Sequence, residues 1–92
     1  MSDLLKLRKR IDEIDENLVA LFAQRMDVSA EIARYKQQHN LPVYDPDREK
    51  QKLQDLSGKV TKDREPYITT LYSFIFELSR FEQERILNSG VN

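Results

Sequence analysis

Apolar side chains recur with the period of an α-helix along most of the chain. In the first third they alternate by steps of three and four residues, with one member missing at position 25, at Leu4, Leu7, Ile11, Ile14, Leu18, Leu21, Val28, Ile32 and Tyr35. This spacing keeps the apolar residues on one helix face and predicts one very long helix over about residues 2–38. Asn40 and Pro42 end the pattern, because the residue before a proline is disfavoured in helical geometry.

Two further helices are expected after this break. Within VYDPDREK (residues 43–50), Asp45 is suited to cap a helix and Pro46 to fill its first position, so a short helix should span about residues 45–57. It should bury Leu53, Leu56 and Val60. A medium helix over about residues 64–88 carries Ile68, Leu71, Tyr72, Ile75, Leu78, Phe81, Ile86 and Leu87. The fold class is therefore all-α, with three helices in a single domain over residues 1–92.

The first helix is too long for a compact protein of this size. A helix of some 35 residues spans on the order of 50 Å, and two shorter helices cannot cover its whole apolar face. The remaining cover must come from another copy of the chain. We therefore expect a homodimer in which the long helices pair antiparallel across a twofold axis.

Composition excludes several classes of protein. The 15 basic and 16 acidic side chains give a net charge of −1, so there is no electrostatic footprint for nucleic acid or an anionic membrane. With no cysteine and only His39, a disulfide framework and a metal site are not expected. No apolar stretch has the length of a signal peptide or a membrane span, so we expect a cytoplasmic, soluble protein.

Five polar residues occupy inward helix positions. Arg25 stands where the long helix should be apolar, and Lys36, three turns later, shares its face. Glu49 extends the apolar row of the short helix backwards, while Ser79 and Gln83 lie on an apolar row of the medium helix. A buried arginine needs an anionic partner and a buried glutamine needs hydrogen bonds, because unpaired buried polar groups are costly.

Each of these residues also has an ordinary structural explanation. Arg25 could pair with an acidic residue of the partner helix or extend to solvent, Lys36 could face the helix dipole, and Ser79 could serve close packing. Together, however, they lie on inward faces of three helices, which is how helical bundles build ligand sites. The set suits an anionic ligand held by hydrogen bonds and charge rather than covalent chemistry.

Four segments resemble the all-helical chorismate mutases in order and spacing, across nearly the whole chain. They are LRKRIDEIDENLVALFAQR, EIARYK, PVYDPDREK and YITTLYSFIFELS. The resemblance, which is to the glutamine-bearing bacterial branch, implies an intertwined homodimer with two active sites, each completed by the other chain. It also implies the rearrangement of chorismate to prephenate, on the route to phenylalanine and tyrosine, without cofactor or metal. The family's site positions fall on Arg8, Arg25, Lys36, Asp45, Arg48, Glu49, Ser79 and Gln83.

The resemblance also implies roles for these residues. Arg8 of the partner chain and Arg25 would hold the two carboxylates of the substrate, and Lys36 and Gln83 would donate to its ether oxygen. Glu49, helped by the backbone near Asp45, would accept from the ring hydroxyl, while Arg48 and Ser79 complete the walls. The catalytic set would be Lys36, Gln83, Arg25 and Glu49.

The origin of Arg8 follows from helix geometry. Arg8 and Lys36 are 28 residues apart in one predicted helix, a separation of about 42 Å. Both side chains cannot touch one small ligand from the same chain, so Arg8 must arrive from the partner of an antiparallel dimer.

Two other kinds of function stay open from the sequence. One is a related enzyme on the same scaffold, an isochorismate pyruvate-lyase or an aminodeoxychorismate mutase. The other is a catalytically silent helical dimer that regulates or docks onto another shikimate-pathway enzyme, with residues 90–92 as a docking tail. No segment resembles a prephenate dehydratase, a prephenate dehydrogenase or an amino-acid-binding regulatory domain.

Overall fold

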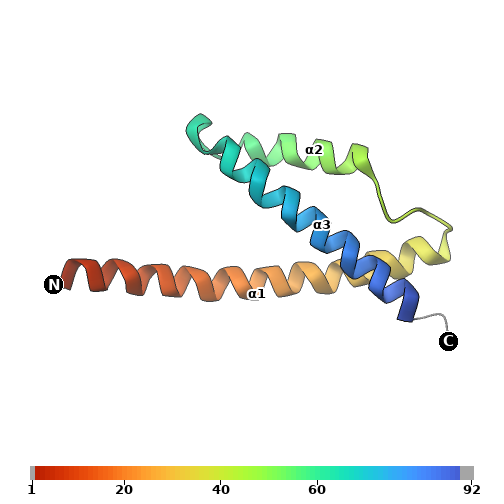
Figure 1. Ribbon diagram of the computed structural model, residues 1–92, viewed down its shortest axis with the longest axis horizontal. Coiled ribbons are helices and arrows are strands. Elements are labelled where there is room, and N and C mark those ends of the chain that lie inside the picture. Colours follow the sequence, from red (N-terminus) through yellow and green to blue (C-terminus); the bar gives the residue numbers. More distant parts are fainter. Residues whose placement is uncertain (1, 90–92) are drawn as a thin grey trace.

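The computed structural model describes residues 2–89, and every element of regular secondary structure in that range is a helix. A very long helix α1 (Ser2–Gln38) is followed by a short α2 (Pro46–Ser57) and a medium α3 (Glu65–Ser89), with one 3₁₀ turn η1 (Lys62–Arg64) before α3 (Figure 1). The predicted all-α fold of one very long, one short and one medium helix is confirmed. The docking tail considered at residues 90–92 lies outside the described residues.

The end of α1 is a left-handed turn at Asn40, whose φ is 54°. The Leu41 amide donates to the Lys36 carbonyl at 2.8 Å, and the Asn40 amide donates to the Gln37 carbonyl at 3.4 Å. This pair of bonds satisfies two carbonyls that the end of a helix leaves free, and asparagine is the side chain that best tolerates the conformation after glycine. The chain reverses here, so that α2 runs back against the direction of α1, and α3 then crosses the C-terminal part of α1 obliquely (Figure 1).

The beginning of α2 is a capped turn of the kind predicted. Asp45 is the N-cap residue, its Oδ1 accepts from the Arg48 amide at 3.1 Å, and Pro46 fills the first helical position. A cap of this type contributes about 1 kcal/mol to helix stability. Because the cap fixes where α2 begins, it also fixes the directions in which Arg48 and Glu49 leave the helix.

The buried contacts of the chain are few and lie where α3 crosses the C-terminal part of α1 (Figure 1). Three buried residues come from each helix: Ser29, Ala30 and Ala33 from α1, and Phe76, Ser79 and Gln83 from α3. Ala33 is completely inaccessible to solvent. The small side chains of α1 let the two helices approach closely, and half of the buried residues are polar, so hydrophobic burial within one chain is limited.

Packing is looser than the apolar patterns of the two shorter helices suggest. The expectation that Leu53, Leu56 and Val60 are buried is wrong, because α2 contains no buried residue and all three side chains are only half-buried. In α3, Leu78 and Phe81 are 46% and 67% exposed. The physical reason is that each helix meets its neighbour along one side only, which leaves its other apolar positions uncovered.

The N-terminal part of α1 extends beyond the other helices (Figure 1). Its apolar face is more than half exposed at every position, namely Leu4, Leu7, Ile11, Ile14, Leu18 and Leu21. The radius of gyration is 16.8 Å, against about 12 Å expected for a compact chain of this length. The accessible surface of 7653 Å² exceeds by about 2,000 Å² that of a compact protein of this mass.

Within residues 2–89, none of the helices is long and apolar enough to cross a membrane. The cytoplasmic location stays a prediction from the sequence.

We predict that Ala33→Leu destabilises the protein by about 1–3 kcal/mol, because added methylenes in a packed contact force the helices apart. Urea unfolding at fixed protein concentration measures this change. The matched control is Ala20→Leu on the exposed part of the same helix, which should change stability by less than about 0.5 kcal/mol. Equal effects of the two substitutions would contradict the packing at the crossing.

Candidate active site

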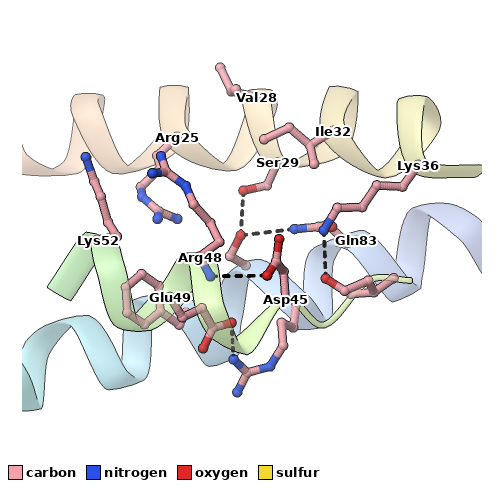
Figure 2. A pocket seen from close by; sticks show the side chains of 14 residues that line it. Arg25, Val28, Ser29, Ile32, Lys36, Asp45, Arg48, Glu49, Lys52 and Gln83 are labelled. Atoms are coloured by element: carbon pink, nitrogen blue, oxygen red, sulfur yellow. Dashed lines mark hydrogen bonds and ion pairs between the residues drawn. The ribbon is translucent and has the colours of Figure 1, made fainter. Parts of the chain in front are cut away.

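A cavity of about 450 Å³ opens where α1, α2 and α3 face one another (Figure 2). Its size is within the range of small-molecule sites. The lining residues from α1 are Arg25, Val28, Ser29, Ile32 and Lys36, and those from α3 are Phe76, Ser79, Arg80 and Gln83. The connection and α2 contribute Val43, Asp45, Arg48, Glu49 and Lys52.

Seven of the eight residues expected in a site line this cavity, and Arg8 does not. Arg8 is exposed and precedes Arg25 by 17 residues on α1, a separation of about 25 Å along the axis. The cavity of one chain is therefore built without Arg8.

Arg25 lies half-buried at one end of the cavity, between aromatic side chains of α3. Its guanidinium carbon is 6.0 Å from the ring centre of Tyr72 and 5.9 Å from that of Phe76. Within residues 2–89, no carboxylate forms an ion pair with it. Aromatic faces stabilise a cation without consuming its hydrogen-bond donors, so the planar fork of Arg25 stays available to an anion.

Lys36 reaches from the end of α1 across to the connection before α2 (Figure 2). Its Nζ donates to the backbone carbonyl of Val43 at 2.7 Å. An ammonium group has three donors, so two remain for a ligand in the cavity. Val43 could not be predicted from the sequence, because its contribution is a backbone carbonyl.

The floor of the cavity is a buried polar chain across the helix crossing. Ser29 Oγ and Ser79 Oγ are 2.7 Å apart, and Gln83 Nε2 donates to Ser79 Oγ at 3.5 Å. Gln83 is only 6% exposed, and its Oε1 is a buried atom without a hydrogen-bond partner in the described part of the chain. Since a hydroxyl can donate or accept, a half-turn of the amide would let Oε1 accept from Ser79 and aim Nε2 into the cavity.

Asp45 and Arg48 are exposed and stand at the rim of the cavity (Figure 2). One oxygen of Asp45 is used by the helix cap, through the Arg48 amide. The Arg48 side chain forms no ion pair within residues 2–89. At the rim, the guanidinium of Arg48 is therefore free to bind a ligand, whereas one oxygen of the neighbouring Asp45 carboxylate is used by the helix cap.

Glu49 is paired with a residue that the sequence analysis missed. Arg80 of α3 donates from Nη1 to Glu49 Oε2, and its guanidinium carbon is 4.9 Å from the ring centre of Tyr44. The hydrogen bond to the carboxylate raises the pKa of the Arg80 guanidinium above its usual value. The available signal was spacing, because Arg80 follows the buried Phe76 by four residues and so leaves α3 on a neighbouring face.

Positive charge dominates the cavity. Five cationic side chains line it, including Lys52 and Arg80, against the two carboxylates of Asp45 and Glu49. In the part of the chain that the structure describes, no cluster of three or more His, Cys, Asp or Glu side chains could hold a metal ion. The arrangement fits a small molecule with two negative charges, bound by hydrogen bonds and oriented charge.

Comparison with known proteins gives a consistent result. Residues 7–84 match the family described as chorismate mutase type II. The chain is 39% identical over 93 residues to a bifunctional chorismate mutase/prephenate dehydratase of Buchnera aphidicola, with 99% of the chain and 24% of that protein covered. A protein of the same name from Escherichia coli is 37% identical over 91 residues, covering 97% and 24%.

A third relative is the T-protein of Haemophilus influenzae, which is 43% identical over 54 residues, covering 59% of this chain and 14% of that protein. The chain thus spans about a quarter of the length of the two bifunctional relatives.

Proposed function

We propose, because the chain belongs to the chorismate mutase type II family, that it converts chorismate to prephenate. The observation that carries the proposal is the excess of positive charge in one cavity, above a buried glutamine whose Oε1 has no hydrogen-bond partner within residues 2–89. Chorismate is a compact dicarboxylate, so its charge and size match this cavity.

The reaction breaks an ether C–O bond and forms a C–C bond within one molecule. It needs no nucleophile and no proton transfer, so the protein has to hold the reactive chair-like conformer and stabilise the charge that develops on the ether oxygen. Fixed hydrogen-bond donors on rigid helices are suited to both tasks, since their positions need no rearrangement during the reaction.

Two arginines would hold the substrate's carboxylates. Arg25 lines the cavity with its donors free, and its contacts with Tyr72 and Phe76 restrict where the guanidinium can lie. Arg8 of a second copy of the chain would supply the other guanidinium group. Arginine is suited to this role because its planar donors match a carboxylate at two points.

Lys36 and Gln83 would donate to the ether oxygen. The tie to Val43 restricts the Lys36 ammonium while leaving two donors free. For Gln83 we propose the amide orientation in which Oε1 accepts from Ser79 and Nε2 faces the ligand, because every polar atom of the buried chain then has a partner. These bonds strengthen as the ether oxygen gains charge, so they lower the barrier rather than only improve binding.

The remaining residues would fix the ring. Glu49 would accept from the ring hydroxyl through the oxygen that Arg80 does not use. The backbone at Asp45 would assist it, and Arg48 and Ser79 would close the walls of the cavity.

The proposed assembly is an antiparallel homodimer through the apolar face of α1. It is supported by the uncovered face from Leu4 to Leu21 and by the excess surface of about 2,000 Å², which exceeds the roughly 800 Å² that each partner buries in a standard interface. Antiparallel pairing would carry the N-terminal half of one α1 past the C-terminal half of the other. Arg8 would then reach the partner's cavity, which it cannot reach within its own chain.

We predict that the protein consumes chorismate and forms prephenate, and that Lys36→Ala lowers kcat by about a hundredfold or more, the size of effect seen when an oxyanion-type donor is lost. Loss of chorismate absorbance with identification of the product measures this. The matched control is Arg34→Ala, which removes an exposed cation from the same helix and should leave kcat unchanged.

Parallel incubation with isochorismate separates the related activities. Pyruvate release from isochorismate, with no prephenate from chorismate, would replace the proposal by a lyase. No reaction with either substrate would favour a regulatory module.

We predict that activity is nearly constant between about pH 5 and 8, because the amide of Gln83 does not titrate and donates throughout this range. In Gln83→Glu the carboxyl must be protonated to donate, so activity should fall as pH rises. The pH dependence of kcat for both proteins tests this. A flat profile for Gln83→Glu would exclude donation from position 83.

We predict that the double variant Ile14→Glu, Leu18→Glu is monomeric and has lost most helicity and activity, because two charges would be forced into the apolar interface. Light scattering and circular dichroism measure the change. The control is Glu16→Lys, on the opposite side of α1, which should remain a dimer. A fully active monomer of the wild-type chain would contradict both the dimer and the role of Arg8.

A further inference from the structure

Arg80 joins three segments of the chain at the edge of the cavity. Its side chain extends from α3 and donates a hydrogen bond to Glu49 on α2. The same guanidinium lies over the ring of Tyr44 in the connection between α1 and α2. Within residues 2–89 it forms the one ion pair between different helices, because the other pair, Arg85 with Glu82, lies within α3. Figure 2 shows Glu49 on the side of the cavity opposite Arg25 and Lys36 of α1.

Glu49 has several competing partners. Arg25 and Lys36 line the same cavity from α1, and Arg48 and Lys52 line it from α2. None of these four cations is ion-paired in the described part of the chain. A carboxylate only about a quarter exposed gains more from a cation than one in water does, so it will be paired with whichever cation is placed best.

The choice of partner decides what the cavity can bind. Pairing with Arg80 leaves the four cations free and uses only Oε2 of Glu49, so Oε1 can still accept from a ligand. Pairing with Arg48 or Arg25 would neutralise a cation that the proposed function assigns to the substrate or to the cavity wall. A dianionic ligand would then have to displace Glu49 before it could bind.

We infer that Arg80 is a positioning residue that occupies Glu49 and so keeps the cations of the cavity free for a dicarboxylate substrate. The inference rests on the proposed function for the identity of that substrate. Arg80 does not touch the ligand in this scheme. Its contact with the Tyr44 ring and its hydrogen bond to Glu49 of α2 restrict where the guanidinium can lie.

The test is a comparison of KM and kcat for chorismate. Arg80→Ala should raise KM by about tenfold, while kcat changes less. A tenfold change corresponds to the loss of about one hydrogen bond to a charged group. Arg80→Lys should recover part of this loss, because it keeps the charge but not the planar fork. The matched control is Arg85→Ala, which removes an arginine paired with Glu82 on the same helix and outside the cavity, and KM should be unchanged.

A double variant separates positioning from a structural role. Once Glu49 is neutral it no longer competes for the cations, so Arg80→Ala combined with Glu49→Gln should have the KM of Glu49→Gln alone. The inference would be overturned if the double variant raised KM by the combined effect of the two single substitutions. It would also be overturned if the Arg80→Ala protein had the wild-type KM.

A crystal structure of Arg80→Ala tests the pairing without substrate. We expect Glu49 within hydrogen-bond distance of Arg25, Lys36, Arg48 or Lys52, and a Glu49 side chain turned to solvent would refute the inference. This result does not depend on turnover. A wild-type protein that is inactive towards chorismate would instead refute the proposed function, whatever the position of Glu49.

Discussion

Ala33 is completely buried where α3 crosses α1, and small neighbours on α1 allow the two helices to approach this closely. The same crossing aligns Ser29 with Ser79 and so brings Gln83 to the floor of the cavity. The helices α1 and α3 touch at the crossing and separate further along. The cationic side chains lie in the space that this separation leaves. The polar floor is thus a direct product of helix packing, because Ser29, Ser79 and Gln83 are buried at the crossing and also line the cavity.

In the proposed dimer, one side of α1 would serve two purposes along its length. In the N-terminal half it is continuously apolar and exposed, while in the C-terminal half Arg25, Ser29 and Lys36 interrupt the apolar row and line the cavity. The helical period is unbroken, so both halves lie along one side of the helix. A single long helix can therefore offer a dimerisation surface in one half and a ligand-binding surface in the other, without any change in backbone geometry.

Local rules were sufficient to predict much of this architecture. Asp45 and Pro46 identified the beginning of α2, and the regular apolar spacing identified three helices. The inward positions of Arg25 and Glu49 followed from helical rows. What could not be predicted depends on contacts between elements: the backbone carbonyl that holds Lys36, and the arginine that pairs with Glu49 across two helices. Burial was also overestimated for α2, because periodicity identifies an apolar face but not what covers it.

The exposed N-terminal half of α1 bears on how the protein folds. An isolated helix in water is held by little more than its own hydrogen bonds, and within residues 2–89 the apolar face of this half is left uncovered. In the proposed dimer, the N-terminal half of α1 is stabilised by burial of its apolar face, and this burial occurs only when two chains associate. Formation of the native state would then be a second-order process, with a rate set by how often newly made chains encounter one another and a half-folded chain as its transient precursor.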